Sequence, residues 1–390
     1  MSPRDYIANH PVLRLDVQKF EHSPFIERYV TDDTVFGVYS CSGRLFPLSI
    51  GADALADYEQ LCSAAALFDV PQQPVQIEGP DAERLLDRLF VCDVASLPPG
   101  RARYAIACEE HGGLLMDGIL IRLEPERFWY AMADGDFLGW LRAHALGLDV
   151  AVSDPKSWVA AIQGPRSLDV LAAACDEAPP EPFPYFGVAR VRMGGQDVLI
   201  TRTGWSGELG FEVYTERGID GGALWDHVVA AGTPLGMGVQ GLDSLGIRRI
   251  EAGILDNTTD MNVTMTPFAA GLGRFVNLDK PSFIGREALL DADRRTRLFG
   301  VSCESVTPES GMAVNVEGSR VGVVTIGAWS PRLRTGIGYA RMREPGATGG
   351  MEVTLGTGGA PARLVDLPFV DPERRIPRGL PLADGDLTGA

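Results

Sequence analysis

The sequence lacks the residue patterns that mark metal sites and several common enzyme classes. Its 390 residues include only five histidines and six cysteines, scattered without C-x-x-C or H-E-x-x-H spacing, so no metal site is indicated. No Gly-x-Gly-x-x-Gly loop follows an expected strand, and no Walker loop or G-x-S-x-G elbow is present, which gives no support to dinucleotide-dependent hydride transfer or serine hydrolysis. We expect reduced, buried or half-buried thiols and no metal.

Long apolar runs and basic residues are also scarce. No stretch approaches the roughly 18 uncharged apolar residues of a membrane-spanning helix, and the charged N-terminal segment lacks the apolar core of a secretion signal. Acidic residues outnumber basic ones by 52 to 35, giving a formal net charge of −17. Such a surface repels phosphate backbones and anionic lipids. We therefore expect a cytoplasmic protein that binds neither nucleic acid nor membrane.

The chain contains a repeated pattern that predicts two similar halves. Residues 77–86 read Ile-x-Gly-Pro, four residues and then Leu-Leu, and residues 162–171 read Ile-x-Gly-Pro, four residues and then Val-Leu. A Gly-Gly pair follows each copy, at 112–113 and at 194–195. The order favours an internal duplication, although two independent strand–turn–helix units remain the alternative. A junction between two such halves is a natural place for a ligand pocket.

The residue pattern of the sequence changes near residue 290. From there, short alternating segments are separated by Gly, Pro and Ser, which is typical of a small all-β barrel or sandwich. We therefore divide the chain into a region of two intertwined α+β halves (1–290), a β domain (291–376) and a flexible tail (377–390).

The segment TGWSGELG (203–210) is the clearest candidate for a binding loop. Its glycines let the backbone turn tightly or approach a ligand closely. The carboxylate of Glu208 suits a ligand edge rich in N–H donors, such as a 2-amino-4-oxo-pterin. From spacing alone, a glycine-rich turn with an exposed acid is the simpler interpretation.

A second candidate is the hairpin that contains Tyr104 and Asp117. Its tip is expected at His111, which we interpret as a solvated loop residue. Asp117 follows Met116 between apolar runs, so it is either an inward-facing functional group or a turn former beside Gly118.

Several basic residues could provide local positive charge for a ligand with carboxylates. Arg248 and Arg249 are adjacent on an expected helix and diverge by about 100°, so we expect only one of them to face inward. The other candidates are Arg202, Arg274 and Lys280.

Four segments in chain order resemble the glycine-cleavage T-protein (aminomethyltransferase) family. They are ITRTGWSGELGFEVY (200–214), RRIEAG with the following DMN and PFAAGLGRFV (248–276), PSFIGREALL (281–290) and the segment from SRVGVV to GYARM (319–342). The resemblance implies an α+β fold with duplicated folate-binding α/β halves around a central cavity and a C-terminal antiparallel β-barrel. It also implies tetrahydrofolate as the cofactor.

The resemblance assigns roles to individual residues. Glu208 would hold the pterin edge, and Tyr104 and Asp117 would be the catalytic candidates. The residues implied to bind the cofactor are Glu208, Trp205, Gln163, Arg249 and Tyr104.

The sequence departs from the family pattern at two positions. In the family's GG-x-x-DD-type run the first acid, which is catalytic, falls here on Met116, and only the second, Asp117, is present. An arginine of the family's helix motif falls on Leu245. The missing acid argues against aminomethyl transfer and against a lipoyl carrier protein as a partner.

Details of the motifs favour the tetrahydrofolate-dependent demethylase branch. The segments RTGWSGELG, IRRIEAG and ADGDF (133–137) with Trp140 are similar to dimethylsulfoniopropionate demethylase. Methyl transfer from an onium centre needs alignment of donor and acceptor more than an acid, whereas an aryl ether would need a proton donor such as Tyr104, Asp117 or Tyr39.

We therefore predict transfer of a methyl group from a small methylated metabolite (sulfonium, quaternary ammonium or methoxy compound) to N5 of tetrahydrofolate. The alternatives are an aminomethyltransferase of glycine cleavage and a non-enzymatic folate-binding accessory protein. The identity of the donor and the oligomeric state are left open.

Overall fold

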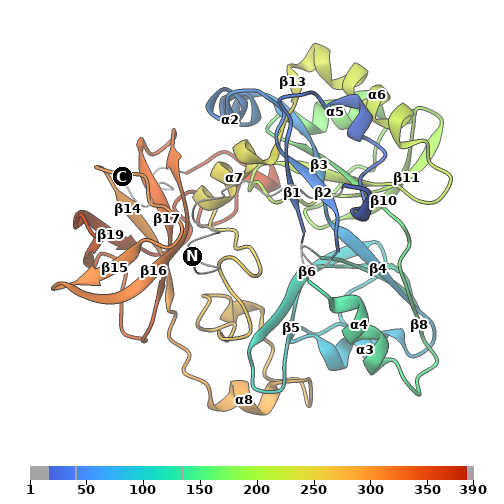
Figure 1. Cartoon of the computed structure of the whole chain (residues 1–390). Coiled ribbons are helices and arrows are strands. Elements are labelled where there is room, and N and C mark those ends of the chain that lie inside the picture. The colour runs from blue at the N-terminus through green and yellow to red at the C-terminus, as the bar shows by residue number, and fades with distance from the viewer. Residues whose placement is uncertain (1–16, 40–41, 133–134, 384–390) are drawn as a thin grey trace.

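Two large β-sheets, a small two-stranded sheet and a closed barrel make up the β structure of the described residues (Figure 1). The computed structural model describes residues 17–39, 42–132 and 135–383. The two large sheets lie next to each other on one side of the molecule, and the barrel, drawn in orange, lies on the other side. None of the helices within these ranges is long and apolar enough to cross a lipid bilayer.

The first half is an antiparallel sheet with the strand order β5-β6-β7-β4-β8, covered by two helices. The apolar spacing of the first helix predicts its buried stripe correctly, because Leu85, Leu86 and Leu89 are all buried. The elements are β4 (Gln73–Glu78), α3 (Ala82–Leu89), β5 (Arg101–Cys108), β6 (Leu114–Glu124), β7 (Arg127–Met132), α4 (Phe137–His144) and β8 (Ala151–Ser153).

The second half is a six-stranded sheet with the order β10-β11-β12-β9-β3-β13. All its strand pairs are antiparallel except the pair of β13 and β3. The elements are α2 (Ala54–Ser63), β3 (Ala65–Val70), β9 (Val159–Gln163), α5 (Ser167–Ala174), β10 (Val188–Met193), β11 (Gln196–Thr201), β12 (Gly210–Tyr214), α6 (Gly221–Gly232), β13 (Met237–Val239) and α7 (Leu242–Glu251).

The predicted duplication is confirmed by the order of these elements. β4-α3-β5-β6-β7-α4-β8 in the first half corresponds to β9-α5-β10-β11-β12-α6-β13 in the second, and β3 is inserted between β9 and β13. Gly79 and Gly164 occupy equivalent turns with φ of 140° and 120°. A Cβ at either would lie 2.5–2.6 Å from a main-chain oxygen, which explains why both copies of the repeat place glycine there.

The C-terminal domain is a closed antiparallel barrel, so the barrel rather than the sandwich is confirmed. Its strands follow the order β14-β17-β16-β15-β18-β19. They are β14 (Leu298–Cys303), β15 (Ala313–Val316), β16 (Ser319–Ser330), β17 (Thr335–Met342), β18 (Glu352–Leu355) and β19 (Ala360–Val365).

Shorter elements join these parts. After the barrel the chain returns toward the two halves, where Pro377 is buried, and residues 384–390 of the expected flexible tail lie outside the described residues. The shorter elements are the ribbon of β1 (Val35–Val38) and β2 (Leu45–Ser49), α8 (Arg286–Asp291), and the 3-10 turns Val17–Lys19, Ile26–Arg28, Thr233–Leu235, Gly273–Phe275 and Ile376–Arg378.

Helix α7 corrects one expectation. Arg248 and Arg249 are 0% and 2% exposed, so both are buried rather than only one. The helix has no solvent face at this point, because it packs against α2 and β2 on one side and against β16 and β17 of the barrel on the other. Two adjacent arginines can therefore point in different directions and still be buried.

Candidate active site

A cavity of about 550 Å³ lies between the two halves, α7 and the chain that follows the barrel. Strands from both sheets contribute to it, as expected for the junction of a duplicated fold. Acidic and aromatic side chains form much of its lining. They include Tyr39, Tyr104, Asp117, Tyr185, Trp205, Glu208, Glu212, Asp256 and Phe275.

Tyr104 and Asp117 form a hydrogen-bonded pair on the wall made by β5 and β6. Tyr104 is registered opposite Ile119, which places its side chain on the same face of the sheet as Asp117, two residues earlier. The phenol of Tyr104 donates to Asp117 Oδ2 at 2.8 Å. Both residues line the cavity, so the structure brings together the two catalytic candidates.

The environment of this pair shifts the protonation of Asp117. Burial raises the pKa of the carboxyl from its usual 3.8 to about 7; the hydrogen bond from Tyr104 opposes this shift, and the negative charge of Asp256 adds to it. Burial and the neighbouring Asp117 raise the pKa of Tyr104 well above its usual range. Near neutral pH, Asp117 can therefore gain or lose a proton, while Tyr104 stays protonated.

Met116 points away from the cavity. Successive side chains of a strand alternate between the two faces of a sheet, and Met116 is 3% exposed within the apolar core of the first half, in the cluster that also contains Phe90 and Phe137. Asn257 Nδ2 lies 3.7 Å from its sulfur. The acid that β6 presents to the cavity is thus Asp117, and a side chain at position 116 belongs to the core.

Glu208 lies on the opposite wall, in the glycine-rich loop between β11 and β12. It is only 5% exposed and lines the cavity, so the exposed turn that spacing alone favoured is not what the structure shows. The preceding Gly207 has φ of 71°, a left-handed conformation suited to glycine. Arg248 Nε donates to Glu208 Oε1 at 2.7 Å from behind.

Trp205 lines the same cavity, but two other residues predicted to bind the cofactor lie behind its wall. The guanidinium of Arg249 lies 4.7 Å from the Trp205 ring centroid and pairs with Asp260 at 2.8 Å. Gln163 is fully buried and accepts a 2.7 Å hydrogen bond from Ser206. Arg249 and Gln163 therefore support the loop that carries Trp205 and Glu208.

The comparison with known proteins follows the same division of the chain. Residues 44–280 match the GCVT N-terminal domain, and residues 294–371 match the glycine cleavage T-protein C-terminal barrel domain. The chain belongs to the glycine cleavage T-protein family. Together with its relatives, this membership makes it a one-carbon transferase enzyme.

Two kinds of T-protein family member, named for different reactions, are similar to this chain. An aminomethyltransferase of Rubrobacter xylanophilus is 36% identical over 83% of this chain and 88% of its own length. The dimethylsulfoniopropionate demethylase of Ruegeria pomeroyi is 31% identical over 79% of this chain and 86% of its own. The structure of the glycine cleavage system aminomethyltransferase T from Bartonella henselae superposes with a TM-score of 0.81, at 27% identity, over 90% of this chain and 98% of that one.

The T-protein fold also brings to the cavity residues to which the sequence motifs assigned no role. Asp256 and Asn257 come from the loop after α7, and residues 372–378 come from the chain after the barrel. Glu212 lies within the recognised TGWSGELGFEVY segment, and its carboxylate accepts a hydrogen bond from Gln72 at 2.8 Å. Only the three-dimensional fold identifies the 372–378 segment, because its sequence has no chemical signature.

The basic residues proposed from sequence are divided between the cavity and other roles. Arg274 lines the cavity, with its guanidinium 4.7 Å from the Phe275 ring centroid. Lys280 instead donates to three main-chain carbonyl oxygens in and just after α3 and pairs with Asp87. Arg202 donates to two main-chain carbonyl oxygens. Two arginines that sequence reasoning did not consider, Arg374 and Arg378, also line the cavity.

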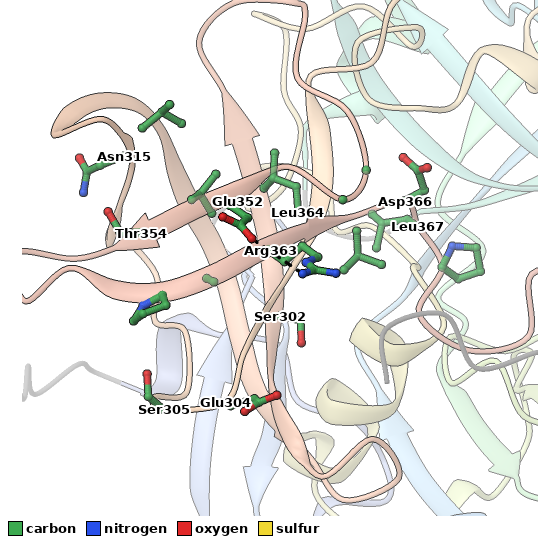
Figure 2. Close-up of a pocket in the computed structure, with 18 of the residues that line it drawn as sticks. Ser302, Glu304, Ser305, Asn315, Glu352, Thr354, Arg363, Leu364, Asp366 and Leu367 are labelled. Atoms are coloured by element: carbon green, nitrogen blue, oxygen red, sulfur yellow. Dashed lines mark ion pairs between the residues drawn. The ribbon is translucent and has the colours of Figure 1, made fainter.

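A second hollow, of about 1070 Å³, lies on the outer face of the barrel. Figure 2 shows its lining side chains along β18 and β19, with the ion pair of Arg363 and Glu352 near the middle. Both members of this pair are solvent-exposed, and the hollow shares only Pro372 with the cavity between the halves. It contains none of the site residues indicated by the sequence.

Proposed function

We propose that this one-carbon transferase moves a methyl group from a small methylated metabolite, a sulfonium, quaternary ammonium or methoxy compound, to N5 of tetrahydrofolate. The observation that supports this proposal is a single cavity that contains both Glu208 and the Tyr104–Asp117 pair. Glu208 offers an anchor for a donor-rich heterocycle, and the pair offers a group that accepts a proton near neutral pH.

The residues of the cavity fit a reduced folate. A volume of about 550 Å³ lies within the usual range for sites that hold a ligand of this size. Trp205, Phe275 and Tyr104 provide ring faces for stacking, and the carboxylate of Glu208 complements the N–H edge of a pterin. The glutamyl carboxylates would be matched by Arg274, Arg374 and Arg378, which line the cavity.

The chemistry assigned to the chain is orientation and proton transfer. When bound, tetrahydrofolate supplies N5 as the methyl acceptor, and its N–H proton must leave as the new N–CH₃ bond replaces the donor–CH₃ bond. Asp117 in its ionised form takes that proton, and Tyr104 holds the carboxylate in place through its hydrogen bond. A sulfonium or ammonium donor leaves as a neutral sulfide or amine, so no acid is required on the donor side. A methoxy donor leaves as an oxyanion that needs a proton, for which Tyr104, Asp117 and Tyr39 at the cavity are the candidates.

Aminomethyl transfer is a second candidate because Asp117 faces the cavity. The argument against it from sequence was the missing acid at position 116, yet that side chain lies in the core. Asp117, with a pKa of about 7, provides an acid in the cavity, and several of the relatives are named aminomethyltransferase.

A donor screen tests the proposal. The protein is incubated with tetrahydrofolate and individual sulfonium, quaternary ammonium and methoxy compounds, and 5-methyl-tetrahydrofolate is measured by mass spectrometry. Formation of methyl-folate with one donor class supports the proposal. Ammonia release from an aminomethyl-loaded lipoyl protein, without methyl-folate from any donor, would show the second function, and folate binding without any turnover would indicate an accessory protein.

A further inference from the structure

We propose that Arg248 and Arg332 are positioning residues that hold the carboxylate of Glu208 toward the cavity, so that the barrel is part of the folate site. The inference rests on the proposed function, since it concerns how the folate anchor is held. It assigns a role to a barrel residue that does not itself line the cavity.

Both arginines contact the same oxygen of Glu208 from behind the cavity wall. Arg248 Nε lies 2.7 Å from Glu208 Oε1, and Arg332 Nη2 lies 3.6 Å from it. Glu208 lines the cavity, whereas neither arginine does. The carboxylate is therefore held through Oε1, an arrangement that fixes its orientation relative to a ligand.

A second carboxylate completes the cluster around Arg248. Arg248 Nη1 lies 3.5 Å from Glu251 Oε2, and Glu251 accepts hydrogen bonds from Tyr58 at 2.8–2.9 Å and from Ser330 at 2.5 Å. The cluster thus joins α2, α7, the glycine-rich loop and the β16–β17 turn of the barrel. Its two arginines and two glutamates have balanced formal charges, as buried ions require.

The charges of this cluster depend on one another. Burial by itself would lower the pKa of Arg248, but the carboxylates of Glu208 and Glu251 outweigh that effect and raise it. Arg248 is completely buried, whereas the side chain of Arg332 is 21% exposed. Arg332 can therefore be replaced with less risk to folding, which makes it the better residue for a test.

The primary experiment compares Arg332→Gln with Arg334→Gln. Arg334 lies in the same turn but is exposed, so it is a matched control for loss of a charge at this place. We expect Arg332→Gln to weaken binding of tetrahydrofolate roughly tenfold, because a partly buried ion pair with the anchor is lost. The KM for folate should rise to a similar extent while kcat and the KM for the methyl donor change less than about twofold, and Arg334→Gln should resemble the wild type.

A double-mutant cycle separates positioning from a general structural effect. If Arg332 acts through Glu208, Arg332→Gln should change folate affinity less than about twofold in a Glu208→Gln background. The same loss in both backgrounds would show that Arg332 acts elsewhere. Arg248→Lys, which keeps the charge but loses the planar fork of donors, should also weaken folate binding, with thermal melting used to verify that it is folded.

The outcomes also distinguish this inference from the proposed function. Wild-type protein that does not bind tetrahydrofolate would overturn the proposed function and the inference together. Wild-type protein that binds folate, with an unchanged affinity in Arg332→Gln, would overturn the positioning role alone.

Discussion

The phenol of Tyr104 donates a 2.8 Å hydrogen bond to Asp117 Oδ2 inside the cavity between the two halves. The two side chains come from neighbouring antiparallel strands, so their relative position is fixed by the register of the sheet and does not depend on a loop. A carboxylate held in this way can act as a proton acceptor with little reorganisation.

The first prediction concerns the pH dependence of turnover. Because the pKa of Asp117 is about 7, and because the proposed reaction requires its ionised form to accept the proton from the acceptor nitrogen, kcat/KM should rise with pH through about 7 and level above it. Asp117→Asn should lower kcat/KM roughly 10²-fold and remove this ionisation from the profile. The measurement is kcat/KM against pH for both proteins, and a wild-type rate that falls as the pH rises through 7 would assign Asp117 the role of an acid.

The second prediction concerns stability. The folded-state pKa of Asp117 is raised above its usual 3.8, so between about pH 4 and 7 the folded protein retains a proton that the unfolded chain has released. The contribution of Asp117 to stability therefore falls as the pH rises through this window. Thermal melts of wild type and Asp117→Asn should diverge between pH 5 and pH 8, with the variant relatively more stable at pH 8. Parallel curves across this range would contradict the shift.

The third prediction compares two replacements of Glu208. Glu208→Gln keeps an acceptor oxygen but loses the charge, and should weaken binding of tetrahydrofolate roughly 10- to 100-fold, corresponding to about 1.5–3 kcal/mol for a hydrogen bond to a charged group. Glu208→Ala should weaken it further and also lower the melting temperature, because Arg248 would lose its 2.7 Å partner in a fully buried place. Equal folate affinity of Glu208→Gln and wild type, by isothermal titration calorimetry, would show that Glu208 is not the anchor.

Local sequence patterns predict those parts of the fold that depend on interactions between residues close together in the chain. The repeated Ile-x-Gly-Pro segments correspond to equivalent turns in which only glycine fits, at Gly79 and Gly164. The short alternating segments after residue 290 indicate β structure, but spacing alone cannot distinguish a barrel from a sandwich. Closure depends on the pairing of β14 with β19, a contact between distant parts of the chain.

Residues of the site can be predicted from the sequence where they lie in recognised motifs. Four of the predicted site residues, Glu208, Trp205, Tyr104 and Asp117, line the cavity. Whether a motif residue touches the ligand or supports the wall is a property of packing, and Gln163, which the resemblance implies to bind the cofactor, is not among the residues that line the cavity.

Residues outside recognised motifs were not predictable. Arg374 and Arg378 reach the cavity only because the chain returns from the barrel to the two halves. The arginine cluster around Glu208 was missed for a related reason, since Arg332 lies far along the chain and its contact with Glu208 follows from docking of the barrel.

The fourth prediction concerns Met116, whose side chain is 3% exposed in the core of the first half. Introducing a carboxylate by Met116→Asp would not place an acid in the cavity, and would bury a charge in the apolar core, where the Asn257 amide, 3.7 Å from the Met116 sulfur, is a neutral donor that cannot balance the charge. We expect the variant to lose several kcal/mol of stability and to gain no activity in either methyl or aminomethyl transfer. Met116→Leu, of similar volume, should change stability by less than about 1.5 kcal/mol and leave turnover close to that of the wild type. Denaturant unfolding and turnover of the two variants provide the test, and a soluble, stable Met116→Asp with a large gain in either activity would show that position 116 reaches the reacting atoms.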